Sequence, residues 1–248
     1  MKFKAKWDVE DYKSYLDEFN DLYSKKPIDN NGGMKSAHMF ASWYVIKKLK
    51  PKFLIESGIW KGLGTWFFEQ ASPETKIISI DPELKFREYI SPKVTYQTTD
   101  FLLTDWSYLP TDETFIFFDD HQNFLQRMQY AKTCGFKKMM YEDNYPVQQG
   151  DCYTPKKIIT NQNFVINCNG IKQMYLKNDE HLKYFIDNIE IYQEMPPIFK
   201  DDKTRWGDEW NENYPTPEPL LDTINKNKYP LFYSERKDYT WICYMELK

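Results

Sequence analysis

The sequence predicts an α/β fold in which a mostly parallel sheet carries helices on both faces. Between residues 51 and 146, short apolar runs alternate with segments of helical periodicity, which is the pattern of βαβ units. The apolar runs end in, or are followed by, acidic residues: Glu56, Asp81, Asp100, Asp119, Asp120, Glu142 and Asp143. Ligands of such sheets bind at the carboxyl ends of the strands, so these acids mark the expected site.

Two helical segments are expected before the sheet. Apolar residues recur at steps of three and four over residues 8–24, with Asp8 as a possible N-cap. A Pro-, Asn- and Gly-rich loop follows, and a second helix over 37–49 should end before Pro51, because the residue before a proline disfavours helical backbone.

The sheet elements follow in order. Strands are expected over 51–58, 76–82, 93–100, 114–121 and 136–146, with helices over 61–72 and 122–135 between them. Beyond residue 150 the pattern weakens. Residues 189–199 could form a sixth strand, 200–223 reads as a long loop or insertion, and 239–247 as a final strand, perhaps antiparallel.

Composition excludes several classes of protein. Among 248 residues, 33 basic and 37 acidic side chains leave a net charge of −4, so a general nucleic-acid or membrane-surface partner is not expected. No apolar run reaches the length of a membrane span, and the N-terminal segment has no secretory h-region. The four cysteines share no CxxC spacing, which favours reduced thiols and a cytoplasmic protein.

The first strand–loop–helix unit predicts a nucleotide-type ligand. Gly58, Gly62 and Gly64 follow Glu56, and glycines let the backbone pass close to a ligand. Glu56 could accept a hydrogen bond from the amino group of an amino-acid ligand. Asp81 suits the two hydroxyls of a ribose, and Asp100 lies where an adenine amino group could be recognised. Alternatively, these are only the glycines and acids that any parallel sheet carries at its loops.

These residues carry a resemblance. IESGIWKGLGTW followed by IISIDPE resembles the first two motifs of class I S-adenosylmethionine-dependent methyltransferases, over roughly residues 35–145. The resemblance implies a three-layer Rossmann-like methyltransferase fold with seven strands, the sixth and seventh near 189–199 and 240–247. It also implies that residues 1–50 cover the pocket of a 51–248 core. The residues expected around the cofactor are Glu56, Gly58, Lys61, Gly62, Asp81, Asp100 and Asp119, although Lys61 could equally be solvated.

The fourth and fifth strand ends predict a divalent-metal site. DDH at 119–121 and EDN at 142–144 would bring four carboxylates together, and their mutual repulsion favours a bound cation. Oxygen ligands suit Mg²⁺, Mn²⁺ or Ca²⁺, and Mg²⁺ or Mn²⁺ is the cofactor we expect. Such an ion could bind vicinal sugar hydroxyls, with His121 as the nearby base. Alternatively, these acids are solvated or cap the next helix.

DDHQN with YEDNY also resembles the metal-dependent sugar O-methyltransferases and the cephalosporin hydroxylase-like family. The resemblance implies Asp119, Glu142 and Asp143 as metal ligands and His121 as the base. In those families the histidine more often follows the first acid by three residues, whereas here it follows by two. Asp120 is therefore open as an alternative ligand, and it is counted with His121 among the catalytic candidates.

The leading hypothesis is an S-adenosylmethionine-dependent, metal-assisted O-methyltransferase that acts on a hydroxyl of a sugar or glycan precursor. The protein could form a homo-oligomer. The alternatives are a nicotinamide-dependent oxidoreductase, which the missing G-x-G-x-x-G disfavours, and a non-catalytic binding module. Trp206, Trp210 and Tyr214 could form a sugar-stacking surface. Lys35 or His38 could contact substrate, although a lone helical histidine is more often structural.

Overall fold

A computed structural model describes residues 3–168, 170–210 and 215–248 of the chain. Its main sheet has seven strands in the order β3-β2-β1-β4-β5-β9-β8. Strands β1 to β5 run parallel, whereas β9 pairs antiparallel with both β5 and β8. The strands are β1 (Phe53–Ser57), β2 (Lys76–Ile80), β3 (Thr95–Gln97), β4 (Thr114–Phe118), β5 (Lys138–Tyr141), β8 (Ile189–Glu194) and β9 (Cys243–Leu247). The predicted Rossmann-like methyltransferase fold, with its sixth and seventh strands, is confirmed.

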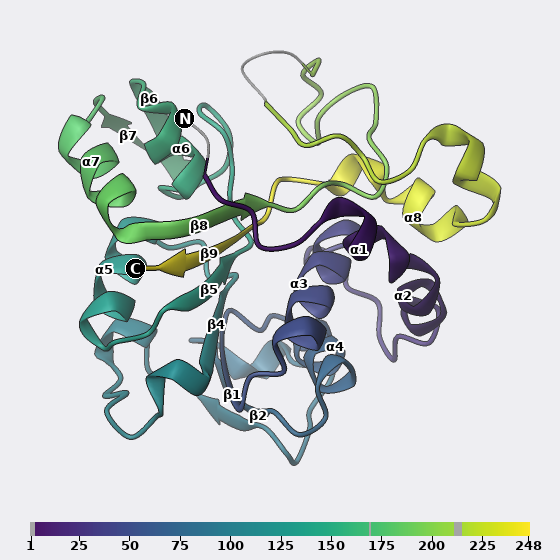
Figure 1. The fold of residues 1–248 in the computed structure, drawn as a ribbon, viewed down its shortest axis with the longest axis horizontal. Coiled ribbons are helices and arrows are strands. Elements are labelled where there is room, and N and C mark those ends of the chain that lie inside the picture. Colours follow the sequence, from purple (N-terminus) through teal and green to yellow (C-terminus); the bar gives the residue numbers. More distant parts are fainter. Residues whose placement is uncertain (1–2, 169, 211–214) are drawn as a thin grey trace.

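Helices cover both faces of this sheet, as predicted. In Figure 1, α1 to α4 lie on one side of β1, β4 and β5, and α5 to α7 lie on the other. The helices are α1 (Val9–Ser14), α2 (Leu16–Tyr23), α3 (Ser36–Leu49), α4 (Leu63–Ala71), α5 (Phe124–Thr133), α6 (Pro155–Thr160), α7 (Asp179–Asn188) and α8 (Pro230–Ser234). Short 3₁₀ turns occupy Leu84–Phe86, Phe101–Leu103, Thr111–Glu113, Thr223–Asn227 and Arg236–Asp238.

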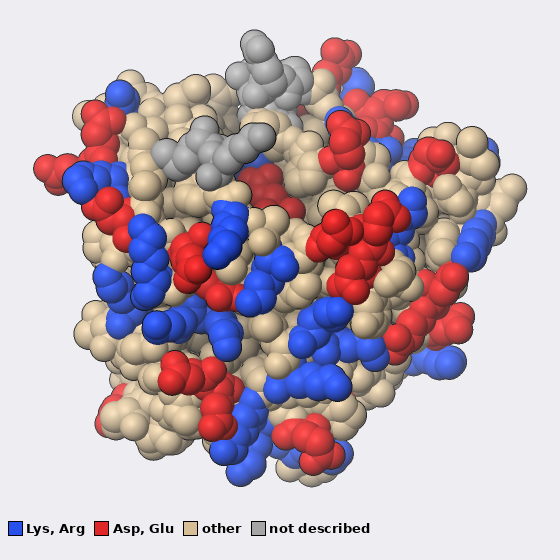
Figure 2. Space-filling view, viewed as in Figure 1, with Lys and Arg blue, Asp and Glu red and all other residues tan. Residues whose placement is uncertain are grey.

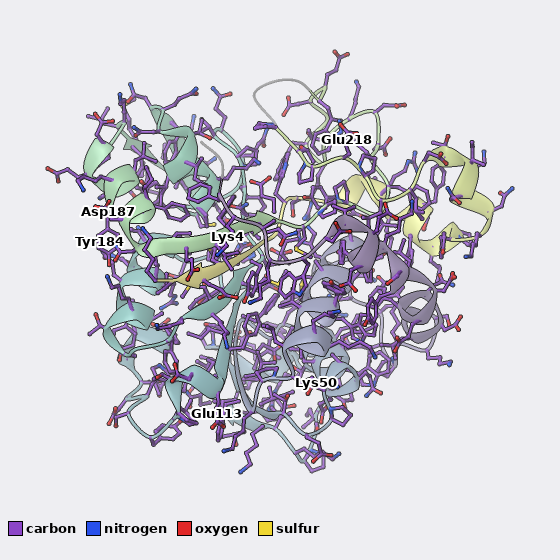
Figure 3. All side chains as sticks on the ribbon, in the orientation of Figure 1. Lys4, Lys50, Glu113, Tyr184, Asp187 and Glu218 are labelled. Atoms are coloured by element: carbon purple, nitrogen blue, oxygen red, sulfur yellow. The ribbon has the colours of Figure 1, made fainter. Side chains whose placement is uncertain are left out.

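Two apolar cores fill the space on either side of the sheet. Alternate residues of β1 point to opposite faces, so Leu54 packs with α3 and α4 while Ile55 packs with α5. Side chains occupy the volume between helices and sheet throughout the view in Figure 3. Aromatic rings dominate the first core, where Phe19, Phe40 and Trp43 each have at most 1% of their surface exposed to solvent. These cores hold the strand ends, and therefore the site, in a fixed arrangement.

The N-terminal segment forms two helices where the periodicity predicted one. Asp8 is the N-cap of α1 and accepts a hydrogen bond from the Glu10 amide, as predicted. Tyr15 separates α1 from α2, and the apolar stripe continues across this junction. The helix before the first strand ends at Leu49, ahead of Pro51, also as predicted. The loop between α2 and α3, which precedes this helix, passes over the carboxyl edge of the sheet.

The hairpin β6 (Phe164–Cys168) and β7 (Ile171–Tyr175) was not predicted. An Asn-Gly pair lies between its two strands in the sequence, which is a strong hairpin signal. The predicted long loop is largely correct, since the described residues between Lys200 and Asp222 form no helix or named strand.

Among the described residues, no helix is long and apolar enough to cross a membrane. Three cysteines, Cys134, Cys152 and Cys243, are free thiols. Lysines and arginines are interspersed with acidic residues on the face shown in Figure 2. The cellular compartment, the oligomeric state and the division at residue 50 stay predictions.

Candidate functional site

Two cavities meet at the carboxyl edge of the parallel strands. The first has a volume of about 380 Å³ and extends from the end of β2 across β1 to β4. The second has a volume of about 510 Å³ and lies beyond β4, toward β5 and the loops that follow it. Both are lined by Gly32, Gly33, Asp119 and His121. A ligand in either cavity would therefore lie next to a ligand in the other.

Asp81 lies in the wall of the first cavity and holds the glycine loop. Its Oδ2 accepts hydrogen bonds from the amides of Ile59 (3.0 Å) and Trp60 (3.1 Å), and Oδ1 accepts one from Glu83 (2.8 Å). A carboxylate has about four acceptor positions, so one remains for a ligand hydroxyl. Asp81 thus lines the first cavity with an acceptor position open to a ligand, and its role as a ribose contact stays a prediction.

Gly58 allows the backbones after β1 and β4 to touch. Its φ is +97°, and a Cβ there would lie 1.8 Å from the Asp119 carbonyl oxygen. Only glycine combines this backbone conformation with such a close approach. The floor of the first cavity at this point is therefore backbone.

Three predicted cofactor residues lie outside the lining of the first cavity. Glu56 is buried beneath it and accepts from the Thr65 and Ser79 hydroxyls, each at 2.6 Å. Burial raises the pKa of Glu56 to about 7. Lys61 forms an ion pair with Glu88 at 2.5 Å, and Gly62 caps α4 with a φ of +88°. These residues support the loop, and the predicted direct contacts of Glu56 and Lys61 with a cofactor are not visible in this geometry.

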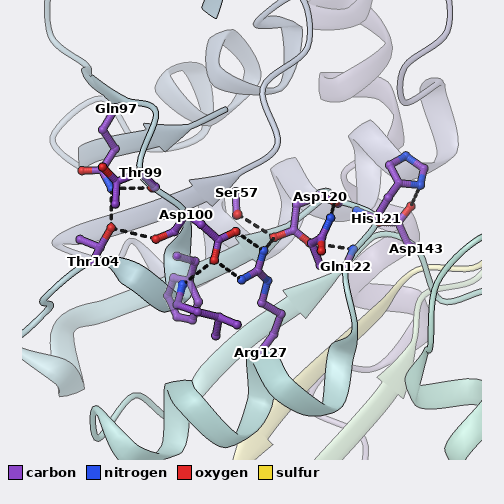
Figure 4. A network of polar contacts seen from close by, with 12 residues as sticks. Ser57, Gln97, Thr99, Asp100, Thr104, Asp120, His121, Gln122, Arg127 and Asp143 are labelled. Carbon is purple, nitrogen blue, oxygen red and sulfur yellow. Dashed lines mark hydrogen bonds and ion pairs between the residues drawn. The ribbon is translucent and has the colours of Figure 1, made fainter. Parts of the chain in front are cut away.

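Arg127 is a buried cation in the wall of the first cavity, and sequence reasoning missed it. Its guanidinium donates two hydrogen bonds to Asp100, at 2.7 and 2.6 Å, and lies 3.0 Å from Asp120. The Ser57 hydroxyl donates to the same Asp120 oxygen (2.7 Å). Figure 4 shows this network joining the ends of β1, β3 and β4. The hydrogen bonds from Arg127 hold the pKa of Asp100 below its usual value.

This network changes what Asp100 and Asp120 can do. Both oxygens of Asp100 are occupied by Arg127, so an adenine amino group would have to share them. Asp120 is committed to Arg127 and Ser57 and does not belong to the ligand cluster around His121. A signal for Arg127 existed in the sequence: it interrupts the buried stripe of α5 formed by Phe124, Leu125, Met128 and Ala131.

Asp119, His121 and Asp143 form the cluster that could hold a metal ion. One ligand atom of each lies within 4.8 Å of the others. Burial, followed by the charges of Glu142 and Asp143, raises the pKa of Asp119 well above its usual value. Burial likewise raises the pKa of Asp143 well above its usual value. Asp143 is 0% exposed, and its Oδ1 has no hydrogen-bond partner.

The donor set fits a divalent cation. A buried carboxylate oxygen without a hydrogen bond is unfavourable. Oδ1 of Asp143 lies 3.4 Å from His121 Nδ1 without a hydrogen bond, and a cation bound here would be a closer partner for this oxygen. Carboxylates supply the hard oxygen ligands that Mg²⁺ and Mn²⁺ prefer. Of the three predicted ligands, Asp119 and Asp143 belong to this cluster, whereas Glu142 does not.

His121 is held in an unusual backbone conformation between carboxylates. Its φ is +52°, a region that non-glycine residues seldom occupy and that is often found at functional sites. Its amide donates to Asp143 Oδ2 (3.0 Å), and Nδ1 lies 3.0 Å from Asp151 Oδ1. The charge of Asp143, the hydrogen bond to Asp151 and the charge of Asp119 raise the pKa of His121 to about 11. Without a cation, His121 therefore carries a proton at neutral pH.

Glu142 lines the second cavity and is fixed by a residue of α3. Its Oε1 lies 2.6 Å from His38 Nδ1, and both side chains are buried. Of the two predicted substrate contacts, Lys35 lines the second cavity, whereas His38 lines neither cavity.

The second cavity offers a mixed polar and aromatic wall. Tyr145 and Trp206 lie edge to face with ring centroids 5.7 Å apart, and Asp151, Asn167 and Arg205 supply polar groups. Trp210 packs against Trp241 at 5.1 Å and does not line the cavity. Tyr214 lies outside the described residues. Of the two described members of the predicted sugar-stacking trio, Trp206 lines the second cavity and Trp210 does not.

No protein-family model matches the sequence, and no curated protein matches it. Several solved structures are similar in fold. The O-methyltransferase from Bacillus cereus in complex with SAH has 10% identity and a TM-score of 0.48, covering 98% of this chain and 92% of its own. A putative O-methyltransferase from Klebsiella pneumoniae has 8% identity and a TM-score of 0.48, covering 96% and 90%.

A CmcI structure with Mg and SAM has 18% identity and a TM-score of 0.38, covering 58% of this chain and 68% of its own. At these identities and TM-scores, activity has to be argued from the residues of the site.

Proposed function

We propose that this chain is an S-adenosylmethionine-dependent O-methyltransferase assisted by a divalent cation, and that its acceptor is a hydroxyl of a sugar or related polyhydroxylated small molecule. The observation that carries the proposal is the shared wall of the two cavities at Asp119 and His121. A cofactor in the first cavity and an acceptor in the second would meet beside the carboxylate cluster.

In the first cavity, Asp81 would accept a hydrogen bond from one ribose hydroxyl at its remaining acceptor position while it keeps its three backbone donors. The backbone at Gly58 would lie against the cofactor, and Asp100 with Arg127 would line the end near the base. S-adenosylmethionine supplies an activated methyl group when it is bound. The contribution of the chain is to align that group with the acceptor oxygen.

At the wall shared by the two cavities, Asp119 and Asp143 would hold Mg²⁺ or Mn²⁺, with His121 in the same cluster. Glu142, which lies in the wall of the second cavity and outside that cluster, would supply a further oxygen ligand. The ion supplies electrophilic activation of an acceptor hydroxyl. The carboxylates fix its position at the wall shared with the first cavity. Asp120 would serve this site indirectly, by holding the loop after β4 through Arg127 and Ser57.

His121 is the candidate for removing the acceptor proton. Its pKa of about 11 arises mainly from Asp143, Asp151 and Asp119, so a cation that neutralises two of these carboxylates would lower it and favour the neutral imidazole. Half of the His121 side chain is exposed, which leaves a path for the proton to solvent.

A sugar acceptor is supported by the character of the second cavity. Trp206 and Tyr145 can pack against the apolar face of a sugar ring. The polar side chains of Asp151, Asn167 and Arg205 can form hydrogen bonds with the sugar hydroxyls. Such a combination of a flat aromatic surface with several polar groups is not needed for an apolar acceptor.

Selective thermal stabilisation tests the proposal against its alternatives. SAH at about 100 times its dissociation constant should stabilise the chain by about 2.7 kcal/mol, whereas NAD at the same concentration should produce no shift, because the loop lacks the dinucleotide glycine pattern. Stabilisation by NAD alone would favour the oxidoreductase. Binding of SAH without Mg²⁺-dependent methyl transfer to a panel of sugars would favour a non-catalytic binding module.

A further inference from the structure

His38 lies on a different element from every candidate metal ligand, and it contacts one of them, Glu142. It belongs to α3, is 2% exposed, and packs edge to face with the ring of Tyr239 at 5.3 Å. Each of its two ring nitrogens has one partner. Nδ1 lies 2.6 Å from Glu142 Oε1, and Nε2 accepts a hydrogen bond from the Thr240 amide at 3.1 Å.

These two contacts fix which nitrogen carries the proton. A backbone amide can only donate, so Nε2 must offer a lone pair. In the neutral ring the proton is then on Nδ1, and Nδ1 donates to the Glu142 carboxylate. The ring cannot flip without leaving the Thr240 amide unpaired in a buried position, which is unfavourable. Glu142 Oε1 is therefore held by a donor of fixed direction.

We propose that His38 is a positioning residue for cation binding: it holds one oxygen of Glu142 so that the carboxylate presents its other oxygen to the cation. This inference rests on the proposed function, because it takes Glu142 as a ligand. Substitution of a residue that orients a metal ligand commonly lowers metal affinity by 10- to 100-fold. Sequence reasoning could not assign the role, since it depends on contacts between residues 104 and 202 positions apart.

Two substitutions separate positioning from simple packing. The side-chain amide of His38→Asn reaches the place of Nδ1, so it can donate to Glu142, but it cannot reach the Thr240 amide. The amide of His38→Gln reaches the place of Nε2, so it can accept from Thr240 but does not replace the donor to Glu142. Met39→Ala is the matched control, because Met39 is the next residue of α3 and is fully buried.

The measurement is Mn²⁺ affinity by calorimetry, with the melting temperature of each metal-free variant. We expect His38→Asn to bind Mn²⁺ within about threefold of the unsubstituted chain and His38→Gln to bind at least about tenfold more weakly. Met39→Ala should lower the melting temperature and leave Mn²⁺ affinity unchanged. Affinity that falls in parallel with melting temperature across all three variants would show that His38 is only a packing residue.

Two outcomes distinguish this inference from the proposed function. If the unsubstituted chain binds Mn²⁺ and His38→Gln binds it equally well, the positioning role is wrong while the metal site stands. If the unsubstituted chain does not bind Mn²⁺, the metal site itself is wrong, and the role of His38 falls with it.

Discussion

Asp143→Asn is expected to reduce Mn²⁺ or Mg²⁺ affinity by at least about 100-fold and to abolish cation-dependent methyl transfer. The amide has nearly the shape of the carboxylate and can still accept from the His121 amide, so the local backbone should be kept. What is lost is the buried anionic oxygen, Oδ1, that has no hydrogen-bond partner. Calorimetry with Mn²⁺ measures the effect.

The same substitution should leave the metal-free fold as stable as before, or more stable. The raised pKa of Asp143 means that its ionised form is disfavoured in the folded chain. Stability of the metal-free chain should therefore fall as pH rises from about 3.9, the usual aspartate pKa, toward the folded value, and this decline should be smaller in Asp143→Asn. Denaturation in EDTA at several pH values tests it.

Asp187→Asn is the matched control for both measurements. Asp187 lies in α7, where Figure 3 labels it, and its side chain is 54% exposed and forms an ion pair with Lys183 on the same helix. It should change neither Mn²⁺ affinity nor the pH dependence of stability. Full retention of Mn²⁺ affinity in Asp143→Asn would contradict the site.

Asp81→Ala is expected to weaken SAH binding by at least about tenfold. A hydrogen bond to a charged group contributes at least about 1.5 kcal/mol, or roughly tenfold in affinity, and one acceptor position of Asp81 is open to a ribose hydroxyl. The substitution also removes the acceptor for the Ile59 and Trp60 amides, which adds to the loss by loosening the loop. Calorimetric titration with SAH measures it, and unchanged affinity would contradict the ribose assignment.

The control is Asp222→Ala. Asp222 also accepts a hydrogen bond from a backbone amide, that of Ile224. Unlike Asp81, it lines neither cavity. It should therefore reproduce the loss of a loop hydrogen bond without affecting SAH affinity.

Much of the fold could be predicted because sheet periodicity and turn residues are local signals. The acids after β2, β4 and β5 were found for the same reason, since parallel strands bring their ends to one edge. Glu56 illustrates the limit. It lies inside β1, opposite Ser79 of β2, and alternation along the strand directs its side chain toward α4. Counting from Leu54, which faces the same side, could have predicted this.

The remaining parts of the site depend on contacts that no short pattern reveals. Asp151 reaches His121 from a loop thirty positions away, and Glu142 is held from α3. Arg127 was detectable only as a charged residue within an apolar stripe, which indicates a buried ion pair but not its partners. Long-range pairing of this kind is determined by the packed fold.

The adjacency of the two bound groups can be measured directly. Mn²⁺ is bound to the chain together with S-adenosylmethionine carrying a ¹³C-labelled methyl group, and electron–nuclear double resonance records the coupling between them. We predict a resolved ¹³C coupling that disappears in Asp143→Asn. Tight binding of both Mn²⁺ and the cofactor without any ¹³C coupling would show that the cation and the methyl group do not meet at Asp119 and His121.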